Sequence, residues 1–441
     1  MKVFKFGGAS INSIERIQNL KVILEGFTGE QLMIIISAMG KTTNALEKVV
    51  ESFYAGKKEE ALNLWEIIKN QHITTAKYVL VTHFNPCLEQ LNNFFTEVEW
   101  MLNDKPQREY DYYYDQIVCV GELLSTSIIS HFLNEMGINN KWIDVRDILR
   151  TDDNFRDANV DWNYTAQKVN QLKEEFLSTL NIQHSRSNIE HPTSDTRYQT
   201  SDIILTQGFI GATDENESTT LGREGSDFTA AIFANLLNAE SLTIWKDVEG
   251  VMSADPKQFP KAQFISELSF DEVIEMAYYG AQVIHPKTIK PLQNKGIPLH
   301  VKCFLFPALP GTVIYKKQMK HLPPIVIIKQ TQVLMHLHSQ DFSFVGEKPM
   351  SRLYEIFGHI RIKPNLIQTG AISVQICLDD MSEKIDHLAA EASSIFDVQV
   401  EKGLSLLTIR HFTNELLNTM TIGKDIVLMQ ETKETVQVLY R

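Results

Sequence analysis

The chain has few cysteines, no long apolar run and no excess of positive charge. Its four cysteines lie far apart in 441 residues and form no CxxC pair, so neither a structural zinc site nor a disulfide framework is predicted. The longest apolar runs, such as Leu32 to Ile36, are too short to cross a bilayer. The amino terminus, MKVFKFGGAS, interrupts any apolar segment with Lys and Gly, unlike a signal peptide. We therefore expect a cytoplasmic protein without a membrane partner.

The charge of the chain is acidic. There are 42 Lys and Arg against 55 Asp and Glu, a net charge of −13, which argues against a nucleic-acid partner. An anionic ligand stays compatible with this charge, because a phosphate site needs only backbone N–H groups and a few cations. The chain is longer than a domain with a single hydrophobic core usually is, so two or three domains are predicted.

The first 300 residues alternate short β-branched runs with longer helical patterns, which predicts an α/β sandwich. Strands are expected at 3–6, 32–37, 142–145, 202–210, 241–245 and 298–303, and helices at 11–25, 59–77, 110–136 and 227–237. The polar segment from His184 to Ser201 predicts a surface loop. A basic stretch with Pro-Pro between Tyr315 and Pro324 predicts a boundary, and hence domains at 1–315 and 325–441.

Beyond this boundary the pattern of elements changes. Strands are expected at 325–338, 371–378, 396–400, 404–410, 426–429 and 435–440, with helices at 348–357, 381–394 and from 413. This order predicts a ferredoxin-like fold, which is common in small regulatory modules.

The first candidate site is KFGGAS, from Lys5 to Ser10, where a predicted strand leads into a predicted helix. Gly7 and Gly8 let a ligand approach the backbone, and a helix start offers free N–H groups to phosphate. Lys5 then adds a positive charge. An ordinary turn with a surface lysine explains the same residues.

The second predicted strand ends in SAMGKTTN. This small-residue turn brings Ser37 and Thr43 to the carboxyl edge of the sheet, where open α/β sheets bind ligands. Alternatively, Thr42 or Thr43 only caps the next helix.

Glu122 lies in VCVGELLS, inside an apolar helical segment. A buried carboxylate is costly without a cationic partner. That partner is either the amino group of a ligand or an internal salt bridge.

The richest segment is LGREGSD, which leads into a predicted helix. The guanidinium of Arg223 can bind a carboxylate through two parallel hydrogen bonds, and Gly225 permits a tight turn. Ser226 and Asp227 fall in the first helical turn, where N–H groups face an anion. Asp227 can orient a lysine or the metal of a nucleotide. Ser226 and Asp227 are each also common helix caps, so either alone could be structural.

Two further segments carry polar residues at predicted strand ends. WKDVEGVMSADPK holds Lys246 and Asp247 and suits a nucleotide loop, although a plain connection looks similar. YYGAQVIHPK places His285 before a helix, where a structural role is expected.

Together these motifs resemble the aspartate kinases of the amino-acid kinase superfamily. KFGG, GEL, TTLGREGSD, KDVEGV…DP and GAQVIHP occur in the order expected of that family, over essentially the whole chain. The resemblance implies a three-layer α/β/α sandwich and an ATP-dependent, Mg²⁺-requiring transfer to L-aspartate that opens lysine, threonine and methionine biosynthesis. No metal-ligating residue of the protein is predicted.

The resemblance also implies residue roles. Lys5 and Asp227 are expected to form the catalytic pair. The predicted aspartate-binding residues are Ser37, Thr43, Glu122, Arg223 and Ser226. The predicted ATP-binding residues are Lys5, Gly7, Gly8, Ser10, Lys246, Asp247, Met252, Lys257 and Gln282.

The chain departs from the family pattern mainly on the nucleotide side. Ala9 stands where Thr is usual, and Lys246 where relatives often have a small hydroxyl residue. Met252 replaces a common Tyr, Lys257 a common Arg and Gln282 a common Lys. Lys246 could compensate for the cation lost at Gln282.

The carboxy-terminal region resembles the ACT regulatory domain, through VLMHLHSQDFSF and PNLIQTGAISVQI. Its length suits one complete unit and a short remnant, whereas family members usually carry two. A homodimer is expected, with lysine or threonine as a candidate effector. Two other hypotheses are a kinase for another amino acid, such as glutamate, and an amino-acid sensor without turnover.

Overall fold

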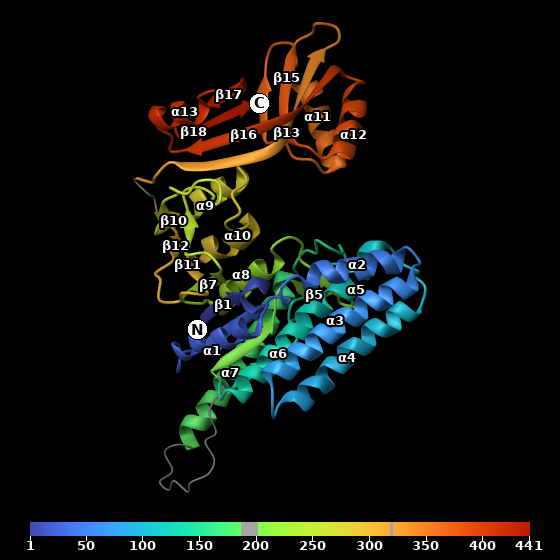
Figure 1. The fold of residues 1–441 in the computed structure, drawn as a ribbon, viewed down its shortest axis with the longest axis vertical. Coiled ribbons are helices and arrows are strands. Elements are labelled where there is room, and N and C mark those ends of the chain that lie inside the picture. Colours follow the sequence, from blue (N-terminus) through green and yellow to red (C-terminus); the bar gives the residue numbers. More distant parts are fainter. Residues whose placement is uncertain (187–201, 318–320) are drawn as a thin grey trace. The chain divides into compact units, whose positions relative to one another are not determined.

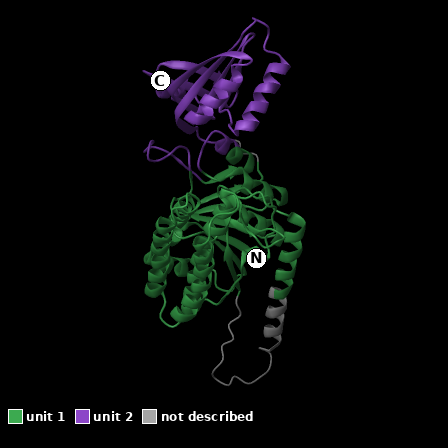
Figure 2. Cartoon of the chain, turned by 90° about the vertical axis from the view of Figure 1, so that its right-hand side faces the viewer, with its two compact units in different colours: residues 1–251, 266–274, 283–318 green, residues 252–265, 275–282, 319–441 purple. Residues whose placement is uncertain are grey.

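The fold is that of a computed structural model, which describes residues 1–186, 202–317 and 321–441. The loop predicted from His184 to Ser201 lies almost entirely outside these residues. The chain forms two compact units, shown in Figure 2. Unit 1 comprises 1–251, 266–274 and 283–318, and unit 2 comprises 252–265, 275–282 and 319–441. The domain limits 1–315 and 325–441 stay a prediction about which parts fold independently.

Unit 1 is built on an eight-stranded sheet in the order β10-β12-β11-β7-β1-β2-β4-β3. Its strands are β1 (Lys2–Phe6), β2 (Leu32–Ile36), β3 (Asn140–Trp142), β4 (Ile203–Gln207), β7 (Leu242–Lys246), β10 (Glu267–Ser269), β11 (Leu299–Cys303) and β12 (Thr312–Tyr315). Neighbours run parallel, except that β11 and β12 are antiparallel. The chain leaves β1 towards β2 and later returns to place β7 on the other side of β1. Ligands bind at such switch points in open α/β sheets.

Helices cover the sheet and complete a three-layer α/β/α sandwich, as predicted (Figure 1). Helix α8 (Gly225–Leu237) packs on β1, β2 and β7, and α10 (Pro286–Lys295) packs on α8. Helix α6 (Val120–Glu135) packs on β2, β3 and β4 and carries α4 (Phe84–Asn103) and α3 (Lys58–Val79). The other elements are η1 (Gly8–Ile11), α1 (Ile14–Glu25), α2 (Thr42–Tyr54), α5 (Tyr110–Val118), η2 (Val145–Asp147), α7 (Trp162–Arg186), α9 (Phe270–Tyr278), β5 (Ile210–Ala212), β6 (Ser218–Thr220), β8 (Val251–Met252) and β9 (Phe264–Ile265).

Several predicted boundaries are wrong; the strand expected at 202–210, for example, is β4 (Ile203–Gln207) followed by β5 (Ile210–Ala212). The first α-helix begins at Ile14 instead of residue 11, because the hydroxyl of Ser13 accepts the N–H of Arg16 at 3.3 Å and caps it. A 3-10 turn occupies Gly8–Ile11. The strand expected at 142–145 lies at Asn140–Trp142, since that is where it pairs with β4.

The helix expected at 110–136 consists of α5 and α6, joined at Cys119. Its length and apolar composition would suffice to cross a membrane, but 89% of its most apolar window is buried inside the protein. It is therefore a core helix, as predicted.

Unit 2 contains a six-stranded antiparallel sheet in the order β14-β15-β13-β16-β18-β17. Its elements are β13 (Ile325–Ser339), α11 (Glu347–Ile360), β14 (Leu366–Thr369), β15 (Ser373–Asp379), α12 (Ser382–Ala392), β16 (Phe396–Arg410), α13 (Asn414–Thr421), β17 (Ile426–Glu431) and β18 (Thr435–Tyr440). The strands expected at 396–400 and 404–410 are one strand, β16.

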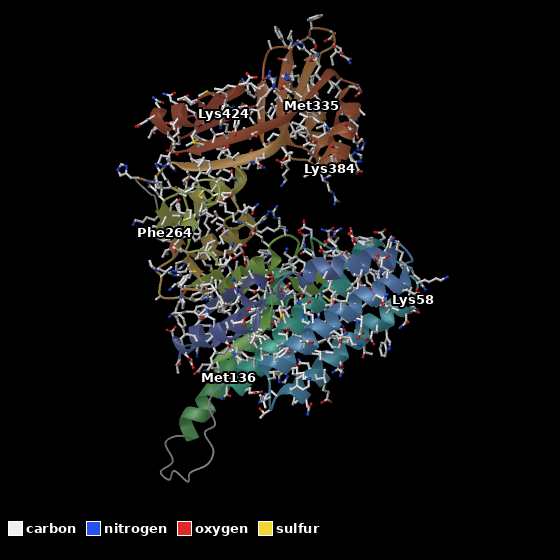
Figure 3. The ribbon with its side chains drawn as sticks, viewed as in Figure 1. Lys58, Met136, Phe264, Met335, Lys384 and Lys424 are labelled. Carbon is white, nitrogen blue, oxygen red and sulfur yellow. The ribbon has the colours of Figure 1, made fainter. Side chains whose placement is uncertain are left out.

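The two parts of the long strand β13 contribute to two different hydrophobic cores. Its pairing with β16 shifts register between Lys329 and Gln332, and Thr331 between them has a positive φ of 55°. Beyond this bulge, Met335, labelled in Figure 3, is fully buried in a core with side chains of α11 and α12. Before the bulge, Val326 lies in a smaller core with Leu417 of α13. The ferredoxin-like prediction is confirmed.

Candidate active site

Unit 1 contains a cavity of about 450 Å³ at the carboxyl ends of β1 and β2 and at the start of α8. This size lies within the usual range for small-molecule sites. It brings together eight residues predicted from the sequence: Lys5, Gly8, Ser37, Thr43, Glu122, Arg223, Ser226 and Asp227. These residues are spread over more than 220 positions of the chain, so the fold assembles them.

Lys5 and Asp227 form a nearly buried ion pair at the base of this constellation. The Lys5 Nζ lies 2.6 Å from Asp227 Oδ1, and the two side chains are 12% and 5% exposed. Burial alone raises the pKa of the Asp227 carboxyl, but the charges of Lys5 and Lys246 outweigh it and hold that pKa below its usual value. Asp227 is therefore ionised at neutral pH and orients Lys5. The alternative of an ordinary surface lysine is wrong.

Glu122 lies on α6 and is 3% exposed. Burial raises the pKa of its carboxyl to about 8, against the opposing effects of the Ala38 and Gly208 N–H groups and the Lys5 charge. Its Oε2 has no hydrogen-bond partner in the described part of the chain. No ion pair to Glu122 is present there either, which removes the alternative of an internal salt bridge. A cationic group of a ligand would satisfy this oxygen.

The turn after β2 separates the two threonines that the sequence left as alternatives. The hydroxyl of Thr42 is buried and donates to the Met39 carbonyl at 2.6 Å, so Thr42 holds the turn. Thr43 lines the cavity, as does Ser37. The backbone carbonyl of Ser37 accepts a bond from Ser125 Oγ at 2.9 Å, which ties this turn to α6.

The start of α8 supplies the cavity with positive charge and dipole. Gly225, Ser226 and Asp227 form its first turn and line the cavity, where the helix N-terminus favours an anion. Arg223 is exposed beside them, and its guanidinium has no hydrogen bond or ion pair to any described residue. Arg223 is thus free to bind a carboxylate.

Gly8 allows the two ligand-side turns to approach each other. A Cβ at this position would lie 2.5 Å from the Ala38 carbonyl oxygen and 2.9 Å from that of Gly40. The Gly40 N–H donates to the Gly8 carbonyl at 3.0 Å. Any larger residue at position 8 would push the turn after β1 away from the turn after β2.

The other predicted nucleotide residues lie outside the lining of this cavity. A Cβ at Gly7 would lie 3.4 Å from Lys5 Nζ, so Gly7 leaves space beside that ammonium group. Ser10 is buried and donates to the Trp245 carbonyl at 3.4 Å, which joins the turn to β7. Lys246 Nζ donates to the Val283 carbonyl at 2.7 Å, and Asp247 is exposed at the end of β7.

Three predicted nucleotide residues, Met252, Lys257 and Gln282, belong to the short segments of unit 2. Their contact with ATP stays a prediction. His285 has the structural role that was expected, because its Nδ1 accepts the Lys287 N–H at 3.1 Å and caps α10.

The lining also contains residues to which the sequence analysis gave no role, among them Tyr114, Arg156, Phe209 and Thr220. Phe209 and Arg156 both have φ near 70°, a left-handed conformation that is unusual for residues other than glycine. Phe209 follows Gly208 at a strand end and could have been suspected. No local signal marks Arg156 or Tyr114.

Solved structures of similar fold include those of Escherichia coli aspartokinase III. Its complex with aspartate and ADP matches with a TM-score of 0.80 at 26% identity, covering 100% of this chain and 96% of that chain. Its complex with lysine and aspartate matches with a TM-score of 0.77 over 100% and 95%.

Curated proteins of similar sequence are also aspartokinases. Aspartokinase 1 of Arabidopsis thaliana is 29% identical over 431 residues, covering 92% of this chain and 70% of that protein. Lysine-sensitive aspartokinase 3 of Escherichia coli is 28% identical over 434 residues, covering 96% and 89%. The model of the amino acid kinase family matches residues 1–303, which contain the whole lining of the cavity. The chain therefore belongs to the amino acid kinase family.

Proposed function

We propose that this protein is an aspartate kinase, which transfers the γ-phosphoryl group of ATP to the β-carboxylate of L-aspartate. The observation that carries the proposal is that one cavity holds two complementary groups. They are the buried Glu122 carboxyl, whose Oε2 has no hydrogen-bond partner among the described residues, and the exposed guanidinium of Arg223. They complement an ammonium and a carboxylate, the two groups of an amino acid backbone. The similarity to aspartokinases over 92% and 96% of the chain supports aspartate as that amino acid.

In this account the walls of the cavity hold aspartate by its backbone groups. Glu122 binds the α-ammonium and Arg223 the α-carboxylate, while Ser37, Thr43 and Ser226 donate hydrogen bonds. The β-carboxylate then faces Lys5. Because an aspartate carboxylate is ionised far below pH 7, the nucleophile needs no general base.

Phosphoryl transfer requires positioning and neutralisation of charge more than covalent help from the protein. Lys5, oriented by Asp227, neutralises the transferring group, and the first turn of α8 adds its dipole. An oxygen of the β-carboxylate bonds to the γ-phosphorus as the bond to the β,γ-bridging oxygen breaks. The products are 4-phospho-L-aspartate and ADP.

ATP is the proposed phosphoryl donor, and the neighbouring aspartokinase III structure with aspartate and ADP supports this choice. Mg²⁺, when bound with the nucleotide, would neutralise its phosphates. In residues 1–186, 202–317 and 321–441 no three His, Cys, Asp or Glu side chains are grouped to hold a metal. The exposed carboxylate of Asp247 at the end of β7 fits an ion held mainly by phosphate oxygens. Lys246, Gly7 and Gly8 would contact the phosphates.

The finer parts of the proposal concern the biological setting. We propose a cytoplasmic homodimer that opens lysine, threonine and methionine biosynthesis, with unit 2 as the regulatory part. The lysine complex of aspartokinase III supports an amino-acid effector. Light scattering of the purified protein with and without lysine or threonine tests both the dimer and its response.

The test of the function is ADP formation with ATP, Mg²⁺ and L-aspartate, with L-glutamate as the control. An acyl phosphate product also reacts with hydroxylamine to give a hydroxamate, which separates transfer to a carboxylate from ATP hydrolysis. Aspartate-dependent hydroxamate supports the proposal. Turnover with glutamate alone would replace the substrate, and no turnover with either would favour an amino-acid sensor.

A further inference from the structure

A second buried carboxylate, Asp115, lies behind the cavity without lining it. Asp115 is on α5, is 0% exposed and makes three hydrogen bonds. Its Oδ2 accepts the backbone N–H groups of Thr220 at 2.8 Å and of Arg156 at 3.0 Å. Its Oδ1 accepts the Thr220 hydroxyl at 2.7 Å. Both partners line the cavity, so Asp115 holds two of its walls from behind.

These bonds connect the helical and loop parts of the acceptor site. Asp115 precedes Glu122 by seven residues, and α5 leads directly into the α6 helix that carries Glu122. Thr220 ends β6 and precedes Arg223 by three residues. One carboxylate therefore links the helix that presents the ammonium-binding group to the loop that presents the carboxylate-binding group.

The loop around Arg156 is held in an unusual conformation by the same carboxylate. Arg156 has φ of 70°, a conformation that costs an arginine free energy. Its backbone N–H donates to Asp115, and its guanidinium lies over the Tyr114 ring, 4.3 Å from the centroid. Asp115 stabilises this strained position from within the core.

Close packing transmits this position to the loop that carries Arg223. Gly222 has φ of 74°, and a Cβ there would lie 2.7 Å from Asp157 Oδ1 and 3.2 Å from the Arg156 carbonyl oxygen. The loop of Arg156 thus lies directly behind Gly222, the residue before Arg223. A shift of the Arg156 backbone moves the support of the Arg223 turn.

We propose that Asp115 is a positioning residue for the amino-acid acceptor, which sets the separation between Glu122 and Arg223 through Thr220 and Arg156. The proposal rests on the proposed function of this cavity. Asp115 makes no hydrogen bond to any residue predicted to bind the nucleotide. We therefore expect Asp115 to affect the binding of aspartate and not that of ATP. A misplacement of the anchors by about 1 Å is enough to lower the reaction rate strongly.

The test compares Asp115→Ala with Asp115→Asn and with Asp152→Ala in the full chain. Asparagine retains an oxygen for the two backbone N–H groups, and its amide can donate to the Thr220 hydroxyl. Asp152 is a control for the loss of a carboxylate that accepts bonds from loop backbone, those of Asn154 at 3.3 Å and Asn159 at 2.8 Å, although Asp152 is exposed and Asp115 is buried. Neither of these partners lines the cavity.

We expect Asp115→Ala to raise the KM for aspartate by about tenfold or more, because buried donors lose their acceptor. We expect less than about a threefold change in the KM for ATP, and both values for Asp115→Asn and Asp152→Ala close to wild type. If Asp115→Ala does not fold, Asp115→Ser takes its place. Thermal unfolding of each variant checks the fold.

An unchanged KM for aspartate in a folded Asp115→Ala protein would overturn the proposal. So would equal rises in both KM values, or an equal effect of Asp152→Ala, since either indicates general loosening of unit 1. Turnover of the wild-type protein with aspartate tests the function itself. If the wild type turns over aspartate and Asp115→Ala has an unchanged KM for aspartate, the positioning role of Asp115 is wrong while the proposed function stands.

Discussion

The acceptor side and the nucleotide side of the proposed site are built differently. Every residue predicted to bind aspartate lines one cavity inside unit 1. The residues predicted to bind ATP are divided, with Lys246 and Asp247 at the end of β7 and Met252, Lys257 and Gln282 in segments of unit 2. Four of them, Lys246, Met252, Lys257 and Gln282, are positions where the sequence is expected to depart from the family pattern. The acceptor cavity is thus fixed by one core, whereas the nucleotide residues vary in type and in the unit that holds them.

Substitution of Lys5 has the largest expected effect, because it is the charged group shared by both sides. In Lys5→Ala the transferring group loses its cation and Asp227 stays buried without its ion-pair partner. We expect kcat to fall about 100- to 1,000-fold, measured as aspartate-dependent hydroxamate. Lys2→Ala is the matched control on the same strand, where Lys2 pairs with Glu30 at the protein surface. Near-normal turnover of Lys5→Ala would remove Lys5 from the mechanism.

Glu122→Gln tests the acceptor side alone. We expect the KM for aspartate to rise roughly 10- to 100-fold through loss of a charged hydrogen bond, with the KM for ATP little changed. Glu135→Gln is the control at the other end of α6. Glu135 accepts the N–H groups of Val81 and His83 and is remote from the cavity lining. A similar rise in both KM values would show that the two sides are not separable at Glu122.

The raised pKa of Glu122 predicts a specific dependence on pH. Its folded value of about 8 lies above the ordinary 4.5, so between these values the folded state binds a proton that the unfolded state does not. The free energy of unfolding therefore falls as pH rises through this window. At pH 8 we expect the free energy of unfolding of Glu122→Gln to exceed that of the wild type by roughly 1–3 kcal/mol, because glutamine carries no charge to bury. Denaturation at pH 5 and pH 8 checks this, and an equal difference at both pH values would contradict it.

Aspartate binding by the wild type should show the same titration. The α-ammonium requires ionised Glu122, so binding below about pH 8 should release a proton. Calorimetry in two buffers of different ionisation enthalpy measures this release. Glu122→Gln should bind without it, and proton release that persists in this variant would assign the titration to another group.

Lys246→Thr has the smallest expected effect and tests the nucleotide side. Lys246 is half-buried, and its charge lowers the pKa of Asp227. We expect the KM for ATP to rise about three- to tenfold, as for loss of one partly solvated cation, with the KM for aspartate unchanged. Lys302→Thr is the control on the adjacent strand β11, where Lys302 lies over the Trp245 ring at 5.6 Å. A change confined to aspartate would reverse the assignment of the two sides.

Local sequence was enough to predict the elements that build the acceptor side. The strands predicted at 32–37 and 241–245 are β2 and β7. Helix α8, predicted at 227–237, begins at Gly225 within LGREGSD. Lys5 was predicted beside two glycines at the end of the first strand, and Glu122 as a carboxylate inside an apolar helical segment. Arg223 and Asp227 were predicted from the LGREGSD segment that leads into a helix.

Contacts between distant segments could not be predicted in this way. Asp115 lies 41 residues before Arg156 and 105 before Thr220, and its neighbours in YDYYYDQIV give no sign that its carboxylate is buried. Two alternatives were resolved only by geometry, since Thr42 bonds to its own turn whereas Thr43 lines the cavity. Helix α1 begins at Ile14 and not at the predicted residue 11, because the Ser13 side chain caps it.

Aspartate kinase activity is best tested by hydroxamate formation with the purified protein, ATP, Mg²⁺ and hydroxylamine, comparing L-aspartate with L-glutamate in parallel. We expect an amount of hydroxamate that depends on aspartate and equals the amount of ADP released, with little or none from glutamate. Release of ADP without hydroxamate, or a product from glutamate and not from aspartate, would contradict it.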